Sequence, residues 1–468
     1  MEQGLAHTTI CAVATPGNGA LAIIRVSGNE AFPVTQKIFR PAKAGKKLED
    51  QPGNTIHFGA IMDGNELVDE VLVSVFRAPH SYTGEHSVEI SCHGSRYIEQ
   101  KIIQLLLESG AVAARPGEFT QRAFLHGKMD LSQAEAVADV IASETKAAHD
   151  VAIRQMRGGF SQKVKELRDR LLHFISMIEL ELDFSEEDVE FADREALMSL
   201  VKEVKSLTDR LMNSFYLGNV LKNGVPVAIV GKPNVGKSTL LNALLREDKA
   251  IVSEIEGTTR DSIEDTVNIE GVVFRFIDTA GIRETADTIE NLGIRRTYQK
   301  INSASIVLLL VDATDPEDII VLSVETLRGQ LQEDQTLVVV INKSDLAGPD
   351  TLERKKSAIP AGENEHIVAI SAGQDHGSDE LTTLLTRLVH APSAGPQDVI
   401  ISNIRHYHAL KASSESLERV IEGIETRLPE DLLAQDIREV LHYLGEITGE
   451  VTTDEILGNI FKNFCIGK

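Results

Sequence analysis

The chain has 468 residues, of which 42% are hydrophobic and 25% charged, a composition typical of a soluble globular protein with roughly two to four domains. Three widely spaced cysteines argue against a disulfide framework and favour a reducing compartment. The formal net charge of −24 argues against a protein that grips nucleic acid alone across a broad basic face, so any such role needs a local patch or a basic partner.

Residues 1–118 are expected to form a small α+β domain. The runs "TTICAVATP", "ALAIIRVSG", "NTIHFGAIM", "ELVDEVLVSVFRAP" and "HSVEISCH" are rich in β-forming residues and are separated by turn residues. One helical stretch, "RYIEQKIIQLLLESG", ends on Gly110. No apolar run is long enough to span a bilayer, and the first residues lack the features of a signal peptide, so we expect a cytoplasmic protein with no membrane role.

Along the rest of the chain the predicted type of secondary structure changes three times. Residues 119–221 show helical periodicity, residues 222–388 alternate strands with helices as βαβ units do, and residues 389–468 are helical again after the linker "HAPSAGPQD". The sequence therefore predicts a multidomain α/β protein. Its N-terminal domain is small and α+β, its central domain is all-α in two halves, and an α/β domain is inserted between those halves.

A phosphate-binding loop is the strongest local signal. "GKPNVGKST" matches GxxxxGK[ST], follows the apolar run "VPVAIV" and precedes the helical "TLLNALL". Backbone amides of this loop would surround the phosphates, Lys237 would reach the β and γ phosphates, and the Ser238 hydroxyl would ligate Mg²⁺. The expected nucleotide contacts are Asn234, Val235, Gly236, Lys237, Ser238 and Thr239.

Three later motifs complete a guanine-nucleotide site. "VVFRFIDTAG" ends an apolar strand at Asp278, expected in the Mg²⁺ shell, and continues through Thr279 and Ala280 to Gly281, whose amide would sense the γ phosphate. In "LVVVINKSD" the expected base contacts are Asn342, Lys343 and Asp345, and in "VAISAG" they are Ser371 and Ala372. A carboxylate at Asp345 accepts two N–H bonds that guanine supplies and adenine does not. Together the four motifs resemble the translation-factor-like GTPases, so the inserted domain, residues 222–388, is expected to be a P-loop (Ras-like) α/β G domain that binds GTP.

Hydrolysis must differ from the Ras-like pattern. Ile282 follows "DTAG", where a glutamine would orient the attacking water, and an apolar side chain cannot do so. Catalysis therefore needs another residue or an added cation. Glu290 is a candidate, although a glutamate on a helix is usually only a solvated charge, and Asn234 in the phosphate loop is a candidate ligand for a cation.

These G motifs, "ARPGEFTQRAFLHGKMDLSQAEAVADVI" and "LGEITGEVTTDEILGNIFKNFCIGK" together resemble one family, the tRNA modification GTPases MnmE (TrmE), over essentially the whole chain. The resemblance implies a homodimer formed through the N-terminal domains, which bind a reduced folate (5,10-methylene-tetrahydrofolate or its 5-formyl analogue). It implies a partner flavoprotein that carries FAD. It also implies that the folate's one-carbon unit becomes part of a carboxymethylaminomethyl or aminomethyl group at C5 of the wobble uridine of certain tRNAs.

The resemblance also assigns site residues. The folate contacts would be Arg25, Glu89, Lys128 and Lys468. A potassium ion replacing an arginine finger would be held by Asn234, Ser253, Ile255 and Thr258. Thr259 would bind Mg²⁺ beside Ser238, Glu290 would position the attacking water, and Glu254, Glu256 and Gly257 would lie in the same nucleotide-binding loop.

Two features depart from the family pattern and leave the shape of the folate pocket open. The loop "ATPGNGALAIIR" is one residue shorter than is common, and the usual "HGG" is His93, Gly94 and Ser95. His93 could line the pocket or could equally be a packed core histidine.

The cysteine near the chain end has several interpretations. Cys465 fits the position of a prenylation box, but Gly467 and Lys468 suit that box poorly. It could simply end an apolar helix in a core. By the resemblance it is catalytic, and its thiolate would either attack C6 of the uridine or carry a one-carbon unit.

A second class of function is a regulatory GTPase switch in ribosome assembly, with the helical halves serving as effector surfaces. The terminal "CIGK" and the "ARPGEF" segment argue against it, because a pure switch needs neither. The enzyme interpretation is therefore preferred, with tRNA binding resting largely on the partner.

Overall fold

The computed structural model describes residues 8–15, 19–183, 194–247, 265–277, 301–332, 335–359, 362, 364–374, 376–389, 400–462 and 464–467. The chain forms two compact units. Unit 1 comprises Met1–Ala142, Ala152–Asp209 and His408–Lys468, and unit 2 comprises Ser143–Val151 and Arg210–Tyr407. This division is coarser than the four segments expected from the sequence, whose boundaries stay a prediction.

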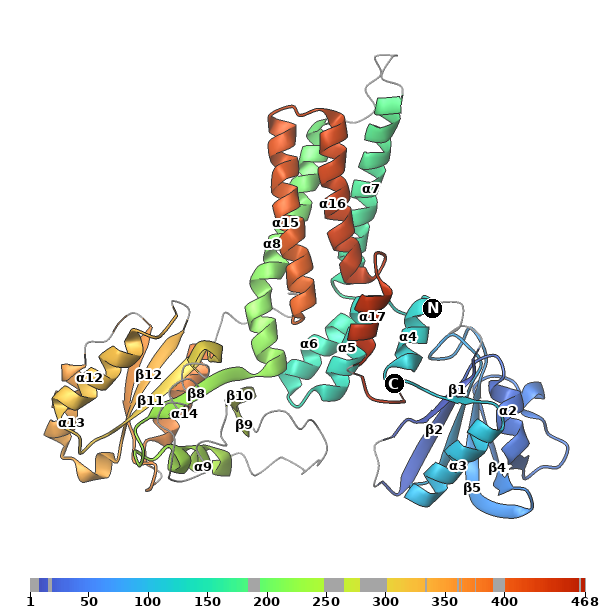
Figure 1. Cartoon of the computed structure of the whole chain (residues 1–468), viewed down its shortest axis with the longest axis horizontal. Coiled ribbons are helices and arrows are strands. Elements are labelled where there is room, and N and C mark those ends of the chain that lie inside the picture. Colours follow the sequence, from blue (N-terminus) through green and yellow to red (C-terminus); the bar gives the residue numbers. More distant parts are fainter. Residues whose placement is uncertain are drawn as a thin grey trace. The chain divides into compact units, whose positions relative to one another are not determined.

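The N-terminal part of unit 1 is a seven-stranded sheet with order β3-β4-β5-β6-β2-β1-β7 (Figure 1). Neighbouring strands are antiparallel except β1 and β7, which are parallel. The elements are β1 (Ile10–Val13), β2 (Leu21–Ser27), α2 (Ala31–Ile38), β3 (Phe39–Pro41), η1 (Leu48–Asp50), β4 (Thr55–Asp63), β5 (Glu66–Phe76), β6 (Ser87–His93), α3 (Arg96–Glu108) and β7 (Val112–Ala113). The expected strands and the helix before Gly110 are confirmed. Helix α2 was not predicted, and its Pro33 lies in the first turn, where proline is tolerated.

Alternation along the strands gives the sheet two different faces. In β2, Ala22, Ile24 and Val26 are buried and belong to the core formed with α2 and α3. Because successive side chains of a strand point to opposite faces, Ile23 and Arg25 lie on the other face.

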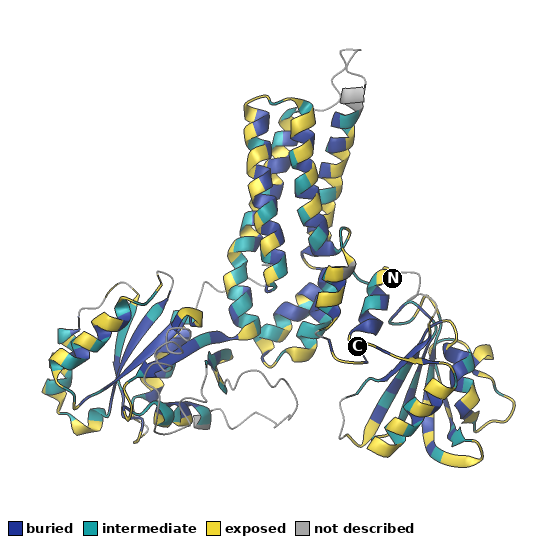
Figure 2. Cartoon of the chain, viewed as in Figure 1, coloured by how far each residue is buried: buried dark blue, intermediate teal, exposed yellow. Residues whose placement is uncertain are grey.

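That second face is only partly covered. Helix α4 (Glu118–Leu125) places Phe119 against Ile10 and Ala12 of β1. The face is more open towards β4 and β5, where exposed residues occur among buried ones along both strands (Figure 2). The large apolar side chains exposed on this face are Leu21, Ile56, Phe58 and Leu72, which are 47–68% accessible.

Strand register places Arg25 on the same face as these exposed side chains. Arg25 of β2 lies opposite Glu89 of β6, Glu89 lies opposite Ser74 of β5, and Ser74 lies opposite Ile56 of β4. Residues directly opposite each other share a face of the sheet. The charged pair of Arg25 and Glu89 therefore lies in the same cross-strand row as the exposed side chain of Ile56.

The rest of unit 1 is helical. The helices that contribute to it are α4, α5 (Leu131–Ala142), α6 (Lys146–Met156), α7 (Ser161–Asp183), α8 (Arg194–Asn223), α15 (Ile404–Glu425), α16 (Glu430–Thr448) and α17 (Asp454–Lys462), with α6, α8 and α15 shared with unit 2. Helix α16 packs against α7, so the two helical segments of the sequence pack together as expected. The apolar residues of α16, including Leu433, Ile437, Val440 and Leu444, recur at three or four positions and are buried. Helix α17 joins α4 and α5 in a small core around Phe461 and Phe464.

Unit 2 contains a six-stranded sheet with order β13-β12-β11-β8-β10-β9, parallel except for the β9–β10 pair. Its elements include β8 (Val225–Gly231), α9 (Lys237–Glu247), β9 (Asp265–Ile269), β10 (Val272–Phe276), β11 (Ile306–Asp312), α12 (Glu317–Arg328), β12 (Thr336–Asn342), η2 (Ser344–Leu346), α13 (Pro349–Ala358), β13 (Glu365–Ala369) and α14 (Ser378–Val389). The central strands are buried on both faces, as covered parallel sheets are. The predicted P-loop α/β domain is thus confirmed.

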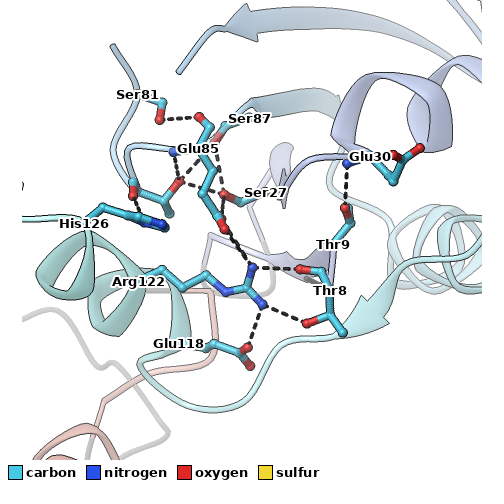
Figure 3. A network of polar contacts seen from close by, with 11 residues as sticks. Thr8, Thr9, Ser27, Glu30, Ser81, Glu85, Ser87, Glu118, Arg122 and His126 are labelled. Atoms are coloured by element: carbon cyan, nitrogen blue, oxygen red, sulfur yellow. Dashed lines mark hydrogen bonds and ion pairs between the residues drawn. The ribbon is translucent and has the colours of Figure 1, made fainter. Parts of the chain in front are cut away.

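A buried ionic network fixes α4 to the sheet (Figure 3). Arg122, which is 2% exposed, donates from Nη1 to the backbone oxygen of Thr8 at 2.7 Å and to Glu85 Oε1 at 3.1 Å. Its Nη2 donates to Glu118 Oε1 at 3.0 Å. Glu85 also accepts a hydrogen bond from Ser27 at 2.8 Å. The sequence places Glu118 and Arg122 four residues apart but carries no pattern that predicts this network.

Across the described parts of the chain, no helix combines the length and apolar character needed to cross a bilayer.

We expect Glu118→Gln to lower the thermal unfolding midpoint at pH 7, because it removes a buried partner of Arg122. Breaking such a buried pair costs about 3–5 kcal/mol. Burial alone would raise the pKa of Glu118, but the hydrogen bonds from the backbone of Arg115 and from Arg122 outweigh it, and the pKa falls below its usual 4.5. The pair therefore stabilises the fold above the unfolded-state pKa, and this contribution is lost as the pH falls through the lowered folded pKa.

The midpoint difference between wild type and Glu118→Gln should thus be largest near neutral pH and shrink in acid. Glu66→Gln, at an exposed position of β5, is the matched control and should unfold like wild type. A Glu118→Gln midpoint equal to wild type at pH 7 would contradict the assignment of the network.

Candidate functional site

The phosphate loop closes tightly between β8 and α9. Strand β8 ends at Gly231 and α9 begins at Lys237. Gly236 has φ +98°, and a Cβ atom there would collide with the side-chain amide of Asn342, so only glycine fits. Asn234 lies exposed in the loop with φ +64°, a conformation that asparagine tolerates better than most residues.

Lys237 lies over this loop. Its Nζ donates to the backbone oxygens of Gly231 at 2.6 Å and Lys232 at 2.8 Å. The ammonium group is therefore held where the loop encloses a phosphate. Val235 and Ser238 lie on either side of the start of α9, and Thr239 follows in its first turn. This geometry fits the triphosphate of a nucleotide.

The guanine motifs are joined to the phosphate loop by hydrogen bonds. Asn342, at the end of β12 and 3% exposed, donates from Nδ2 to the backbone oxygen of Val235 at 2.8 Å. Its Oδ1 accepts from the backbone N–H of Ala372 at 3.0 Å. The carboxylate of Asp345 is exposed and accepts hydrogen bonds from Ser371 and Gln374. The acceptor that the sequence assigns to guanine is thus oriented before a base arrives.

One residue of this site was missed in the sequence. Asp312, the last residue of β11, accepts a hydrogen bond from Lys343 at 2.6 Å. Burial would raise the pKa of Asp312, but the bonds from Lys343 and Thr314 outweigh it and lower the pKa from its usual 3.8. The sequence does carry a signal for Asp312, because this residue ends an apolar strand in the same way as Asn342.

Many expected nucleotide and cation contacts lie outside the described residues. They are Ser253, Glu254, Ile255, Glu256, Gly257, Thr258, Thr259, Asp278, Thr279, Ala280, Gly281 and Glu290. Of the expected Mg²⁺ and potassium ligands, Ser238 and Asn234 are described, and both lie at the phosphate loop.

A second cluster of expected site residues occurs in unit 1. Arg25 bonds Glu89 Oε1 through Nε and Nη2, both at 2.9 Å, and its Nη1 donates to the backbone oxygen of Gly467 at 3.3 Å. The guanidinium carbon lies 5.2 Å from the ring centre of Tyr82 and 5.6 Å from that of Phe119. The second carboxylate oxygen of Glu89 has no hydrogen-bond partner among the described residues and is available to a ligand.

Tyr82 was not predicted as a site residue. Its hydroxyl shares a hydrogen bond with Thr120 of α4 at 2.9 Å, and burial raises its pKa from the usual 10.0. Lys128 bonds the backbone oxygen of Pro79 at 2.9 Å, on the same loop as Tyr82. No sequence pattern marked this loop beyond its turn residues "SYTGEH".

The C-terminal segment lies against this cluster. Gly467 has φ +95°, and a Cβ atom there would collide with the backbone oxygen of Val13, so only glycine allows this approach. The backbone N–H of Gly117 donates to the backbone oxygen of Cys465 at 3.4 Å. Cys465 itself is exposed, which contradicts the interpretation of a packed core thiol. Lys468 lies outside the described residues.

His93 is also not a core residue. Its side chain is 67% exposed, and Nδ1 lies 2.8 Å from Asp69 Oδ1 while its backbone N–H donates to Asp69 Oδ2 at 2.9 Å. The alternative of a packed histidine is therefore wrong. Asp69 is buried in β5 and contacts both the ring and the backbone N–H of His93, so it fixes the ring orientation.

Comparison with known proteins identifies the family. A model of the MnmE helical domain matches residues 131–465, and a model described as the GTP-binding protein TrmE N-terminus matches residues 9–128. A tRNA modification GTPase MnmE of Bacteroides thetaiotaomicron is 55% identical over 462 residues, which cover 98% of this chain and 99% of the relative. The chain belongs to the MnmE family of tRNA modification GTPases.

Another MnmE relative, from Bacteroides fragilis, is 56% identical over 466 residues, covering 98% of this chain and 99% of the relative. Among solved structures, the FeoB G-domain of Methanococcus jannaschii is 27% identical and covers 35% of this chain and 97% of its own, with a TM-score of 0.25. The assignment rests on the MnmE models and the full-length MnmE relatives, and not on that structure.

We expect Asp345→Asn to weaken GTP binding and to improve binding of xanthosine triphosphate. The amide replaces one acceptor by a donor, which suits the oxygen at that edge of xanthine. Losing a charged hydrogen bond of this kind costs about 1.5–3 kcal/mol. Equilibrium titration with both fluorescent nucleotides measures the change.

Asp350→Asn, an exposed substitution in the first turn of α13, is the control and should bind both nucleotides as wild type does. Unchanged nucleotide preference in Asp345→Asn would show that the carboxylate does not read the base.

Proposed function

We propose that this chain hydrolyses GTP and, with a partner flavoprotein that carries FAD, uses a reduced folate to modify the wobble uridine of certain tRNAs at C5. The product would carry a carboxymethylaminomethyl or an aminomethyl group. Membership of the MnmE family supports the tRNA and GTPase parts. The single observation that carries the rest is the hydrogen bond from Arg25 to Gly467, which draws the segment bearing the exposed Cys465 to the Arg25–Glu89 pair.

The residues of the Arg25 cluster suit a folate. Glu89 has a carboxylate oxygen free among the described residues, and a carboxylate can bridge the amide-like edge of a pteridine. Arg25 and Lys128 are cations that suit the glutamate tail, and Lys468 would add a third. When bound, the folate (5,10-methylene-tetrahydrofolate or its 5-formyl analogue) supplies the one-carbon unit.

The open sheet face supports a homodimer formed through the N-terminal domains. Leu21, Ile56, Phe58 and Leu72 form exposed apolar surface on the face that also carries Arg25. An exposed apolar patch of this kind is typical of a protein interface. A second copy on this face would also shield the Arg25 cluster from water.

The phosphate loop supports a cation-assisted hydrolysis. Lys237 would neutralise charge on the β and γ phosphates, and Ser238 would hold Mg²⁺ together with Thr259. Asn234 would hold potassium with Ser253, Ile255 and Thr258, and Glu290 would orient the attacking water in place of the absent glutamine. We place this activity in the cytoplasm, in keeping with three unpaired cysteines.

GTP turnover should be several-fold faster in potassium than in sodium at equal ionic strength. Asn234→Gly should remove most of that difference while leaving GTP affinity nearly unchanged. Glycine is preferred to alanine because residue 234 has φ +64°, where a Cβ atom adds strain of its own. Steady-state phosphate release in the two salts provides the measurement.

Equal rates for the wild-type protein in the two salts would exclude the cation proposal. A loss of GTP affinity in Asn234→Gly would instead point to a damaged phosphate loop.

Cys465→Ser should hydrolyse GTP almost normally but fail to restore modified wobble uridine in a strain that lacks this protein. Serine is nearly the same size as cysteine and far less nucleophilic at neutral pH. Mass spectrometry of tRNA nucleosides measures the modification.

Ile466→Ser, a polar change at the exposed neighbouring position, is the matched control and should restore modification. Full modification with Cys465→Ser would mean that the thiol takes no part in the chemistry. Normal nucleosides in the strain that lacks the protein would overturn the proposed function as a whole.

A further inference from the structure

Arg115 is an exposed arginine whose side chain is oriented by the buried carboxylate of Glu118. Its side chain is 56% exposed, yet its Nε lies 3.3 Å from Glu118 Oε2, and Glu118 is 5% exposed. The same carboxylate oxygen accepts the backbone N–H of Arg115 at 2.9 Å, and the other oxygen accepts from Arg122. The buried network of Figure 3 therefore extends through Glu118 to one surface guanidinium group.

The fold does not need this contact to satisfy Glu118. Both carboxylate oxygens already have partners in the backbone of Arg115 and in Arg122. An exposed ion pair contributes little stability, and holding a long side chain in one rotamer costs conformational entropy. The contact instead leaves the guanidinium group with a defined direction. Within the described residues, neither Nη1 nor Nη2 of Arg115 has a hydrogen-bond partner.

The backbone near Arg115 lies beside the backbone of Cys465. Gly117, two residues further on, bonds the backbone oxygen of Cys465. Two residues span at most about 7 Å. Lys462, the exposed last residue of α17, adds a second positive charge three positions before Cys465. The chain segments that approach Cys465 thus carry two exposed cations, in a chain whose net charge is −24.

We propose that Arg115 binds a backbone phosphate of the RNA substrate beside the nucleotide presented to Cys465. This inference rests on the proposed function and names a binding residue for its RNA substrate. The two free amino groups of an arginine held at Nε form a fork that matches two oxygens of one phosphate. In so acidic a protein, attraction for RNA has to come from local cations, and a pre-oriented one binds with less loss of entropy.

Arg115→Ala in the full-length chain should bind tRNA about tenfold more weakly at low salt, and the dependence of affinity on salt should fall by about one phosphate contact. Arg115→Lys should keep part of the affinity, because it retains the charge and loses the fork. GTP turnover should stay at the wild-type rate in both variants. Arg40→Ala is the matched control, since Arg40 is an exposed arginine of β3, at the opposite edge of the same sheet from β1 and β7.

Four other results would overturn the inference. Wild-type tRNA affinity and salt dependence in Arg115→Ala would show that Arg115 makes no phosphate contact. An equal loss of tRNA affinity in Arg40→Ala would show a general effect of charge. A loss of folate affinity with unchanged tRNA binding would assign the arginine to the folate's carboxylates. A wild-type protein with no affinity for tRNA would overturn this inference, whereas the proposed function is tested separately by the nucleosides of the strain that lacks the protein. If Arg115→Ala unfolds, Arg115→Lys decides: a partial loss of tRNA affinity supports the phosphate contact, and wild-type affinity overturns it.

Discussion

The buried guanidinium group of Arg122 is the interaction on which the proposed chemistry of unit 1 depends (Figure 3). It is shared between Glu85, Glu118 and the backbone of Thr8, which belong to three separate segments of the chain. Removing a charge from water costs several kcal/mol unless partners replace the lost hydration. Because all three partners must be present together, the network fixes the position of α4 on the sheet.

Helix α4 then positions several other groups. Phe119 covers β1 and lies beside the guanidinium of Arg25, and Thr120 holds the hydroxyl of Tyr82. Gly117, just before the helix, meets the backbone of Cys465. A helix of eight residues thus supports the walls of the Arg25 cluster and the approach of the C-terminal segment.

The nucleotide site of unit 2 is held together in a different way. Asn342 bonds both Val235 and Ala372, so the phosphate loop, the base motif and the last motif are fixed by one buried amide. These contacts join loops that follow the parallel strands β8, β12 and β13, whose carboxyl ends lie at one edge of the sheet. The Arg25 cluster instead joins positions 442 residues apart in sequence. Local motifs therefore reveal the first site, and only folding brings the second together.

The sequence by itself determined the P-loop domain, its guanine specificity and the pairing of two helical segments. It could do so because glycine spacing, strand-end polar residues and helical periodicity act over short stretches of chain. It also marked Arg25, Glu89 and Cys465, although only through resemblance to a family. Only the tertiary structure decided the contact of Gly467 with Arg25 and the exposure of Cys465 and His93. It also decided the roles of Tyr82, Asp312 and Arg122. Each depends on which distant segments pack together, and a buried charge or a close backbone approach leaves no periodic signal in the residues that make it.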